Sequence, residues 1–158
     1  MLGLSLLVPA LLLADSEPKQ APRVIAQARW AYAGRDGKAK QFVIRSAADL
    51  VANTPFKDRD APQQVLEKAA TAEVAKALKV KDIDWSKQML VVVTAGTKRS
   101  GGYRVEVTGL KVKDKQLTVA WKLHAPKGAA TAALTHPATV ALVPRHAGKV
   151  AFDPPAKK

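Results

Sequence analysis

The stretch MLVVVTAGTKRSGGYRVEV, residues 89–107, carries the strongest fold signal in the sequence. It opens with the continuous apolar run of residues 89–95, which is typical of a central strand covered on both faces. A glycine-rich polar segment follows, and from Tyr103 onward apolar and polar residues alternate, which is typical of a strand with one buried face. The stretch therefore predicts a sheet protein in which a glycine-rich loop links two strands.

The segments that follow continue the β pattern. The triplet KDK, residues 113–115, predicts a turn into residues 116–124, where the odd-numbered positions from Leu117 to Leu123 share an apolar face. Trp121 lies on that face, and we expect it to be buried against helices. The other elements expected here are a loop at 126–137, a largely buried strand at 138–145 and a closing strand at 148–152.

The segments before residue 89 predict a hairpin and then two helices. Residues 24–33 and 39–46 both have the pattern of strands, and the pair Asp36-Gly37 between them predicts the turn of a β-hairpin. Ser46 and Asp49 form a capping-box pattern that predicts the start of a short helix. A second helix is expected after Asp60, Pro62 and Gln63, with an apolar stripe made of Leu66, Ala70, Val74, Ala77 and Leu78.

This order of elements predicts an α+β fold, with an antiparallel sheet and about two helices packed on one face or end. The chain of 158 residues is divided into a signal peptide at 1–14, a linker at 15–22, a single domain at 23–152 and a flexible tail at 153–158. The apolar run at 2–13 is too short for a membrane span, which needs about 20 residues. We therefore expect an exported protein; the alternative is that this run is a buried element of the domain.

Composition restricts the function. The sequence has no cysteine, so a cysteine-linked lipoprotein is not expected, and disulfides and thiolate sites within these residues are excluded. Its net charge of +13 is spread thinly along the sequence, and aromatic residues make up only 5%, so no nucleic-acid partner is expected. The charge predicts weak adhesion to polyanions. The cations of residues 98–99 and 111–115 are interpreted first as solvated faces.

The sequence offers no convincing catalytic or cofactor pattern. In the glycine-rich segment, Gly96 and Gly101 match the outer glycines of a phosphate loop, but Gly102 and Tyr103 replace its lysine and hydroxyl residues. Ser100 lacks the context of a nucleophile elbow. No metal motif is present, and the histidines and acids are assigned to surfaces, turns and helix caps. We expect a protein that is not an enzyme and has no cofactor.

What remains is a contact loop. Lys98, Arg99 and Ser100 precede Gly101 and Gly102, and Tyr103 begins the next strand. One interpretation is an ordinary hairpin loop. The sharper interpretation is that these six residues form a cationic, tyrosine-edged tip that binds a partner and whose shape the two glycines set.

The sequence also resembles a known family. Residues 83–152 are similar to the PrcB C-terminal domain family, through Gly96, the Gly101-Gly102-Tyr103 element, the turn at Asp114, Pro126-Lys127-Gly128, and Pro137 before the last apolar strand. The family is named for a subunit of a bacterial surface protease complex. The resemblance implies an accessory protein and carries over no catalytic residues.

Four functional hypotheses follow, the last of which is an unrecognised hydrolase. The first is a non-catalytic, exported accessory protein that binds another protein, a secreted protease being one such partner. The second is a protease inhibitor that uses the 97–103 loop. The third is a cell-envelope polyanion-binding protein driven by the net charge.

Overall fold

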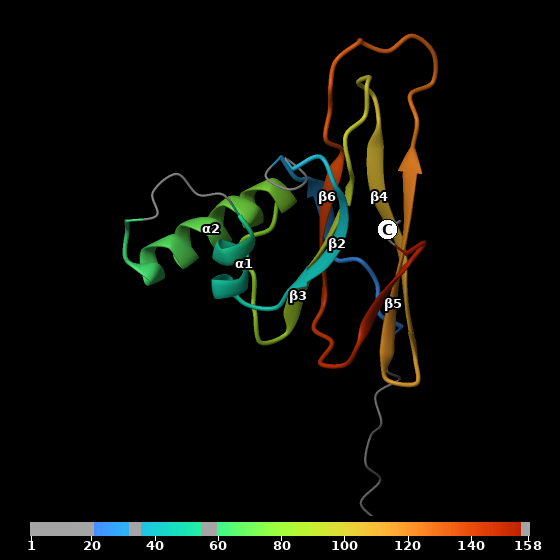
Figure 1. Cartoon of the computed structure of the whole chain (residues 1–158). Coiled ribbons are helices and arrows are strands. Elements are labelled where there is room, and N and C mark those ends of the chain that lie inside the picture. Colours follow the sequence, from blue (N-terminus) through green and yellow to red (C-terminus); the bar gives the residue numbers. More distant parts are fainter. Residues whose placement is uncertain (1–20, 32–35, 55–59, 156–158) are drawn as a thin grey trace, which may run out of the picture.

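The computed structural model describes residues 21–31, 36–54 and 60–155. The expected signal peptide, most of the linker and residues 156–158 of the expected tail lie outside these ranges. The described residues form two sheets and two helices (Figure 1). The elements are β1 Ala26–Arg29, β2 Ala39–Ile44, α1 Ala47–Asn53, α2 Gln63–Leu78, β3 Gln88–Ala95, β4 Arg104–Lys113, β5 Gln116–His124, β6 Ala138–Pro144 and β7 Val150–Asp153.

Strand β3 is central, as predicted. It lies between β6 and β2 in a four-stranded antiparallel sheet of order β1-β6-β3-β2, and every residue from Met89 to Ala95 is buried. Strand β6 is also buried from Ala138 to Val143. Both faces of the two inner strands are therefore covered, which explains why their sequences lack the polar alternation of a half-exposed strand.

The predicted hairpin between β1 and β2 is wrong. The two strands occupy opposite edges of the sheet, where β1 pairs with β6 and β2 pairs with β3. The hairpin prediction rests on strand alternation and on the Asp36-Gly37 turn pair, which are both local features of the sequence. In the fold, β1 and β2 pair instead with the longer apolar strands β6 and β3, which come later in the chain. Local sequence identifies the strands correctly but not their partners.

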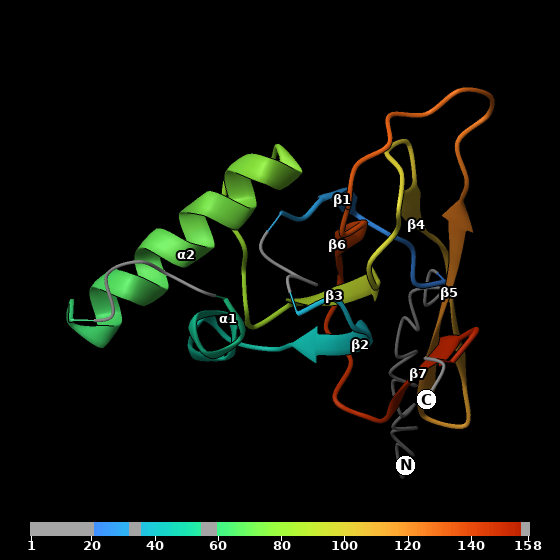
Figure 2. The same ribbon diagram turned by 45° about the horizontal axis from the view of Figure 1, so that its top comes forward.

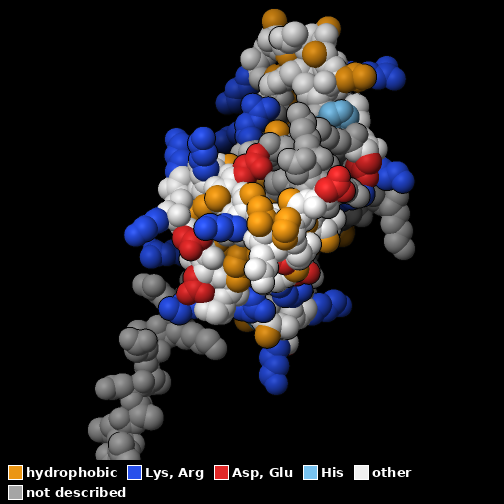
Figure 3. Space-filling view, turned by 90° about the vertical axis from the view of Figure 1, so that its left-hand side faces the viewer, with side chains coloured by type: hydrophobic (Ala, Val, Ile, Leu, Met, Phe, Trp, Pro, Cys, Tyr) orange, Lys and Arg blue, Asp and Glu red, His pale blue; other side chains and the backbone are white. Residues whose placement is uncertain are grey.

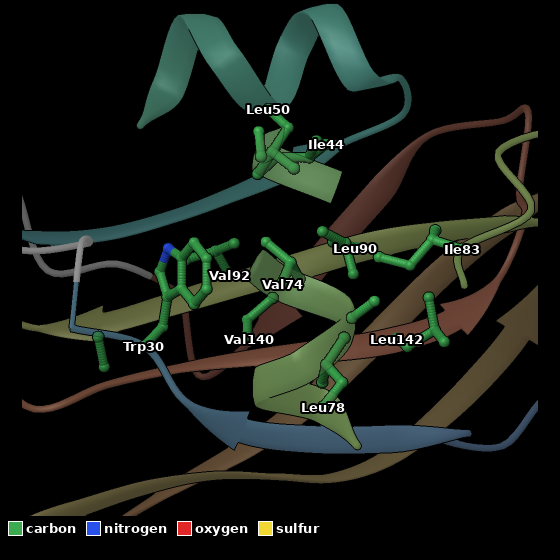
Figure 4. Packing of buried hydrophobic residues seen from close by; sticks show 13 residues of the cluster. Trp30, Ile44, Leu50, Val74, Leu78, Ile83, Leu90, Val92, Val140 and Leu142 are labelled. Atoms are coloured by element: carbon green, nitrogen blue, oxygen red, sulfur yellow. The ribbon is translucent and has the colours of Figure 1, made fainter. Parts of the chain in front are cut away.

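The two helices cover one face of the four-stranded sheet (Figures 1 and 2). Helix α1 begins as predicted, with the Ser46 hydroxyl oxygen accepting a hydrogen bond of 3.1 Å from the backbone N–H of Asp49. In α2 the buried stripe is rotated from the predicted one, so that Ala77 is exposed and Leu66 half-buried, whereas Thr71 and Ala75 are buried. Figure 4 shows the helix–sheet core, which contains Trp30, Ile44, Leu50, Val74, Leu78, Ile83, Leu90, Val92, Val140 and Leu142.

A second sheet covers the opposite face, and the sequence does not predict it as a separate layer. Its order is β4-β5-β7, with β4 and β5 antiparallel and β7 parallel to β5 (Figure 2). Trp121 is half-buried between the two sheets, so the expectation that it packs against helices is wrong. The predicted face of β5 is correct, but the layer that covers this face is β3 and β6.

The end of the domain is also further along the chain than predicted. Asp153 is the last residue of β7. The carbonyl oxygen of Pro154 accepts hydrogen bonds from Nε1 of Trp121 at 2.7 Å and from Nε2 of Gln41 at 3.0 Å. These two residues therefore belong to the folded domain. The α+β class and the helices on one sheet face are confirmed. Within the described ranges, no helix has the length and apolar character needed to cross a bilayer.

Candidate functional site

The glycine-rich segment 96–103 connects the two sheets. It leaves β3 in the four-stranded sheet and enters β4 in the three-stranded sheet, so it is a crossover and the hairpin-loop interpretation is wrong. At the same end of the molecule, loop 125–137 returns from β5 to β6 (top of Figure 1). We call these two segments together the tip.

Backbone hydrogen bonds join the two segments of the tip. Lys98 and Thr135 form an isolated antiparallel bridge. The backbone nitrogen of Lys98 lies 2.8 Å from the carbonyl oxygen of Thr135, and that of Thr135 lies 2.9 Å from the carbonyl oxygen of Lys98. The Thr135 hydroxyl donates to the carbonyl oxygen of Ser100 at 2.8 Å. The backbone N–H of Gly101 donates to the carbonyl oxygen of Thr131 at 2.9 Å. Two segments some thirty-five residues apart in the chain therefore form one structural unit.

A third segment supports the tip at its start. The backbone N–H of Thr97 donates to the carbonyl oxygen of Gly37 at 3.0 Å, and the Thr97 hydroxyl lies 3.3 Å from Nδ1 of His136. Beside Gly37, the Asp36 carboxylate accepts hydrogen bonds from the Lys40 ammonium and from the backbone N–H of Lys38, and these bonds lower the pKa of Asp36. The turn expected to close a hairpin instead anchors the tip.

The two adjacent glycines of the tip have different roles. Gly102 has φ +80°, and a Cβ added to it would lie 2.7 Å from Cβ of Pro126. It is therefore required both for its backbone conformation and for the close approach of the second segment. Gly101 does not adopt a left-handed φ, and a Cβ there would meet Thr131 at an ordinary 3.8 Å.

The structure brings the six predicted site residues together and exposes them unequally. Arg99 and Gly102 are exposed, whereas Lys98, Ser100, Gly101 and Tyr103 are partly buried. The Lys98 ammonium lies 5.8 Å from the centroid of the Tyr103 ring, within cation–π range. Arg99 is therefore the most accessible charge of segment 96–103.

Sequence reasoning misses the contribution of loop 125–137. Its residues 129–134 are all exposed, and Leu134 has 72% of its surface accessible. At the top of Figure 3 this end of the molecule shows hydrophobic side chains and backbone, with basic side chains beside them. The sequence feature that could have indicated this surface is the presence of four alanines and a leucine between Gly128 and Pro137, a composition unusual for a solvated loop.

The titratable groups near the tip form pairs. The Glu106 carboxylate lies 3.2 Å from a guanidinium nitrogen of Arg104 and 2.8 Å from Nε2 of His124. His146 lies elsewhere, with Nε2 2.9 Å from the carbonyl oxygen of Lys115. In the part of the chain that the structure describes, no group of three or more histidine and acidic side chains is arranged to hold a metal ion.

Comparison with known proteins relates this region to a family. No curated protein and no solved structure matches the chain. One family model does match, over the segment from the first buried residue of β3 to the end of β6, which contains β4, β5 and both segments of the tip. Residues 89–144 match the model of the PrcB C-terminal family, in agreement with the resemblance found in the sequence.

Proposed function

We propose that this protein is a non-catalytic, exported accessory protein that binds another protein through the tip, and that this partner is a secreted protease. The observation that carries the proposal is the pairing of segment 96–103 with loop 125–137 through the Lys98–Thr135 bridge. Paired backbone fixes a projecting surface before binding, so little conformational entropy is lost when a partner docks.

The chemistry of the tip suits a protein partner. Arg99 supplies an exposed cation, and Leu134 supplies an exposed apolar side chain on the neighbouring segment. Arginine combined with apolar surface is typical of the energetic centres of protein interfaces. The family match supports the choice of a protease complex, because the family takes its name from a subunit of one.

The non-catalytic part of the proposal rests on the histidines. His124 is paired with Glu106, His136 with Thr97 and His146 with the carbonyl oxygen of Lys115. Their partners lie in three different parts of the chain. Only the Thr97–His136 pair places a hydroxyl beside an imidazole, and among the described residues no third side chain contacts His136 to orient it as a catalytic base.

The test begins with affinity capture of the tagged protein from the cell envelope and culture medium of its native host. The captured protein is then purified, and its affinity for wild-type and variant chains is measured at two salt concentrations. Lys98→Ala combined with Arg99→Ala should weaken binding about tenfold and flatten its salt dependence, because rim cations act through electrostatic steering. Leu134→Ser should weaken binding without changing the salt dependence.

The matched control is Lys76→Ala combined with Lys81→Ala on the helix side. Lys76 and Lys81 are both exposed and lie far from the tip in the chain. Equal losses from the two double variants would refute the tip as the binding surface. Recovery of the protein from the cytoplasm alone would refute export. A partner protease that loses activity on binding would favour the inhibitor hypothesis over the accessory one.

A further inference from the structure

Positive charge is concentrated in one part of the fold. Residues 36–54 and 60–88, which include both helices, carry eight basic and seven acidic residues. Residues 89–155, which include the three-stranded sheet, carry ten basic and only three acidic residues. On the helix side, acidic and basic side chains are interspersed (Figure 3). Most of the excess charge of the described domain therefore belongs to residues 89–155.

A β-bulge places two lysines of this excess on the open face of the three-stranded sheet. The register between β4 and β5 shifts between Val107 and Gly109, and after the shift Leu110 packs inward while Lys111 and Lys113 are exposed. The amide of Gln27 on β1 fixes this point, accepting from the backbone N–H of Val107 at 3.0 Å and donating to its carbonyl oxygen at 3.2 Å. Without the bulge, strand alternation would turn both lysines inward.

A third lysine completes the face from the start of β7. Val150 is opposite Leu117 and packs between the sheets, so alternation turns Lys149 outward beside Gln116. Gln116 is in turn opposite Lys113, and Thr118 is opposite Lys111. Neighbouring strands are about 4.8 Å apart and alternate residues about 7 Å apart, so the three ammonium groups surround two polar side chains. We call Lys111, Lys113, Lys149, Gln116 and Thr118 the base platform.

The adjoining turn adds a fourth lysine in a costly conformation. Asp114 and Lys115 have φ +50° and +61°, and in such two-residue turns the second position normally favours glycine. The backbone of Lys115 is held in place, because His146 Nε2 lies 2.9 Å from its carbonyl oxygen and Gly148 approaches the same oxygen closely. A glycine would adopt this conformation with less strain, so lysine is not the residue that the turn itself favours.

The base platform has unneutralised charge. Lys111, Lys113, Lys115 and Lys149 form no ion pair within the described residues. The nearby acids are Asp114 in the turn and Asp153, which lies opposite Ala120 on the same face as Lys149 but at the other end of β7. Like charges held close together on rigid strands repel one another, and an anionic ligand would relieve this repulsion.

We propose that the base platform, together with Lys115, binds a linear polyanion, a chain that carries phosphate, sulfate or carboxylate groups. Gln116 and Thr118 offer hydrogen bonds to such groups between the lysines. The platform face carries no aromatic ring to stack on a nucleobase, and the exposed Val112 between the two lysines is opposite Leu117 and so lies on the other face of β4. This site lies at the opposite end of the molecule from the tip (Figure 1), so the inference goes beyond the proposed protein partner.

The experiment compares two triple variants of the full-length chain that remove the same charge. Lys111→Gln, Lys113→Gln and Lys149→Gln are combined in one, and Lys68→Gln, Lys76→Gln and Lys81→Gln in the other. Binding to heparin and to inorganic polyphosphate is measured over a range of salt concentrations. Each lysine that no longer contacts the polymer should lower the slope of log affinity against log salt concentration by about 0.7. The first variant should therefore lower this slope by roughly 2, and the second by less than about 1.

Equal slope changes in the two variants would overturn the proposal, because they would show that the charge acts without a site. Binding to vesicles of anionic lipid but to neither polymer would overturn it in favour of a membrane surface. Comparison of heparin with polyphosphate distinguishes a preference for phosphate from a preference for the sulfate and carboxylate groups of heparin. The variant Lys98→Ala with Arg99→Ala should keep the wild-type slope, so a failure here is distinguishable from a failure of the tip.

Lys115→Gly separates binding from folding. Because glycine adopts a left-handed φ without strain, the variant should have an unchanged or higher melting temperature. The slope of log affinity against log salt concentration should fall by roughly 0.7. A lower melting temperature with unchanged polymer binding would show that Lys115 is structural, and would remove it from the site.

Discussion

The two ends of the sandwich carry similar cations on differently built surfaces. At the tip, glycines occupy the strained and crowded positions, backbone bonds join two segments, and exposed apolar side chains accompany Arg99. At the base, a lysine occupies a left-handed position, and the neighbouring face is polar and cationic. The tip has the mixed surface of a protein interface, whereas the base has the uniform charge of an anion site. Net charge alone could not separate these two surfaces.

The largest expected effect is at the base. A Cβ added to Gly148 would lie 2.2 Å from the carbonyl oxygen of Lys115 and 2.9 Å from Nε2 of His146. Backbone cannot yield as a flexible side chain does, so Gly148→Ala should lower the free energy of unfolding by about 3 kcal/mol. Chemical denaturation measures this loss. An effect below about 1 kcal/mol would mean that the turn and loop 145–149 are not packed together.

Gly148 also shows where sequence reasoning fails. The pattern of β7 correctly predicts a closing strand, but nothing in GKVAF indicates that its glycine faces a carbonyl oxygen more than thirty residues away. The same limit applies to the hairpin between β1 and β2. Periodicity identifies strands and their buried faces because both are local properties, whereas partners and close approaches depend on the assembled fold.

A substitution between the two ends should affect both of them. Trp121 packs between the sheets and donates to the carbonyl oxygen of Pro154 at 2.7 Å. Because its side chain is only half-buried, Trp121→Ala should cost about 2 kcal/mol, less than the roughly 3–5 kcal/mol of a fully buried tryptophan. Hydrogen exchange should then increase at both the tip and the base. Faster exchange at one end alone would show that the ends are stabilised independently.

The candidate site is predictable in part. The sequence indicates the segment from Lys98 to Tyr103 because glycines and cations interrupt two strong strand patterns, and its role in binding stays a prediction. Loop 125–137 has the sequence of a simple connection, because its role depends on hydrogen bonds with segment 96–103. From the sequence alone, the lysines of the base are interpreted as a solvated face. The bulge that turns them outward and the lysine beside β7 that completes the platform are properties of the folded sheet.

The smallest expected effects distinguish the two glycines of the tip. Gly102→Ala would force alanine into φ +80° and against Pro126, so it should cost between about 1 and 2 kcal/mol. It should also weaken partner binding, since loop 125–137 would be displaced. Gly101→Ala meets no such obstacle and no left-handed φ, so the free energy of unfolding should change by less than about 0.5 kcal/mol.

Thermal denaturation and partner affinity of this matched pair test whether the tip is fixed by backbone conformation. The two variants have the same composition, so unequal results must come from the local differences between the two positions, of which φ and the approach of Pro126 are the largest. If Gly101→Ala weakens binding as much as Gly102→Ala while leaving stability unchanged, the partner contacts Gly101 itself. In that case the surface of segment 96–103, rather than its pairing with loop 125–137, would determine recognition.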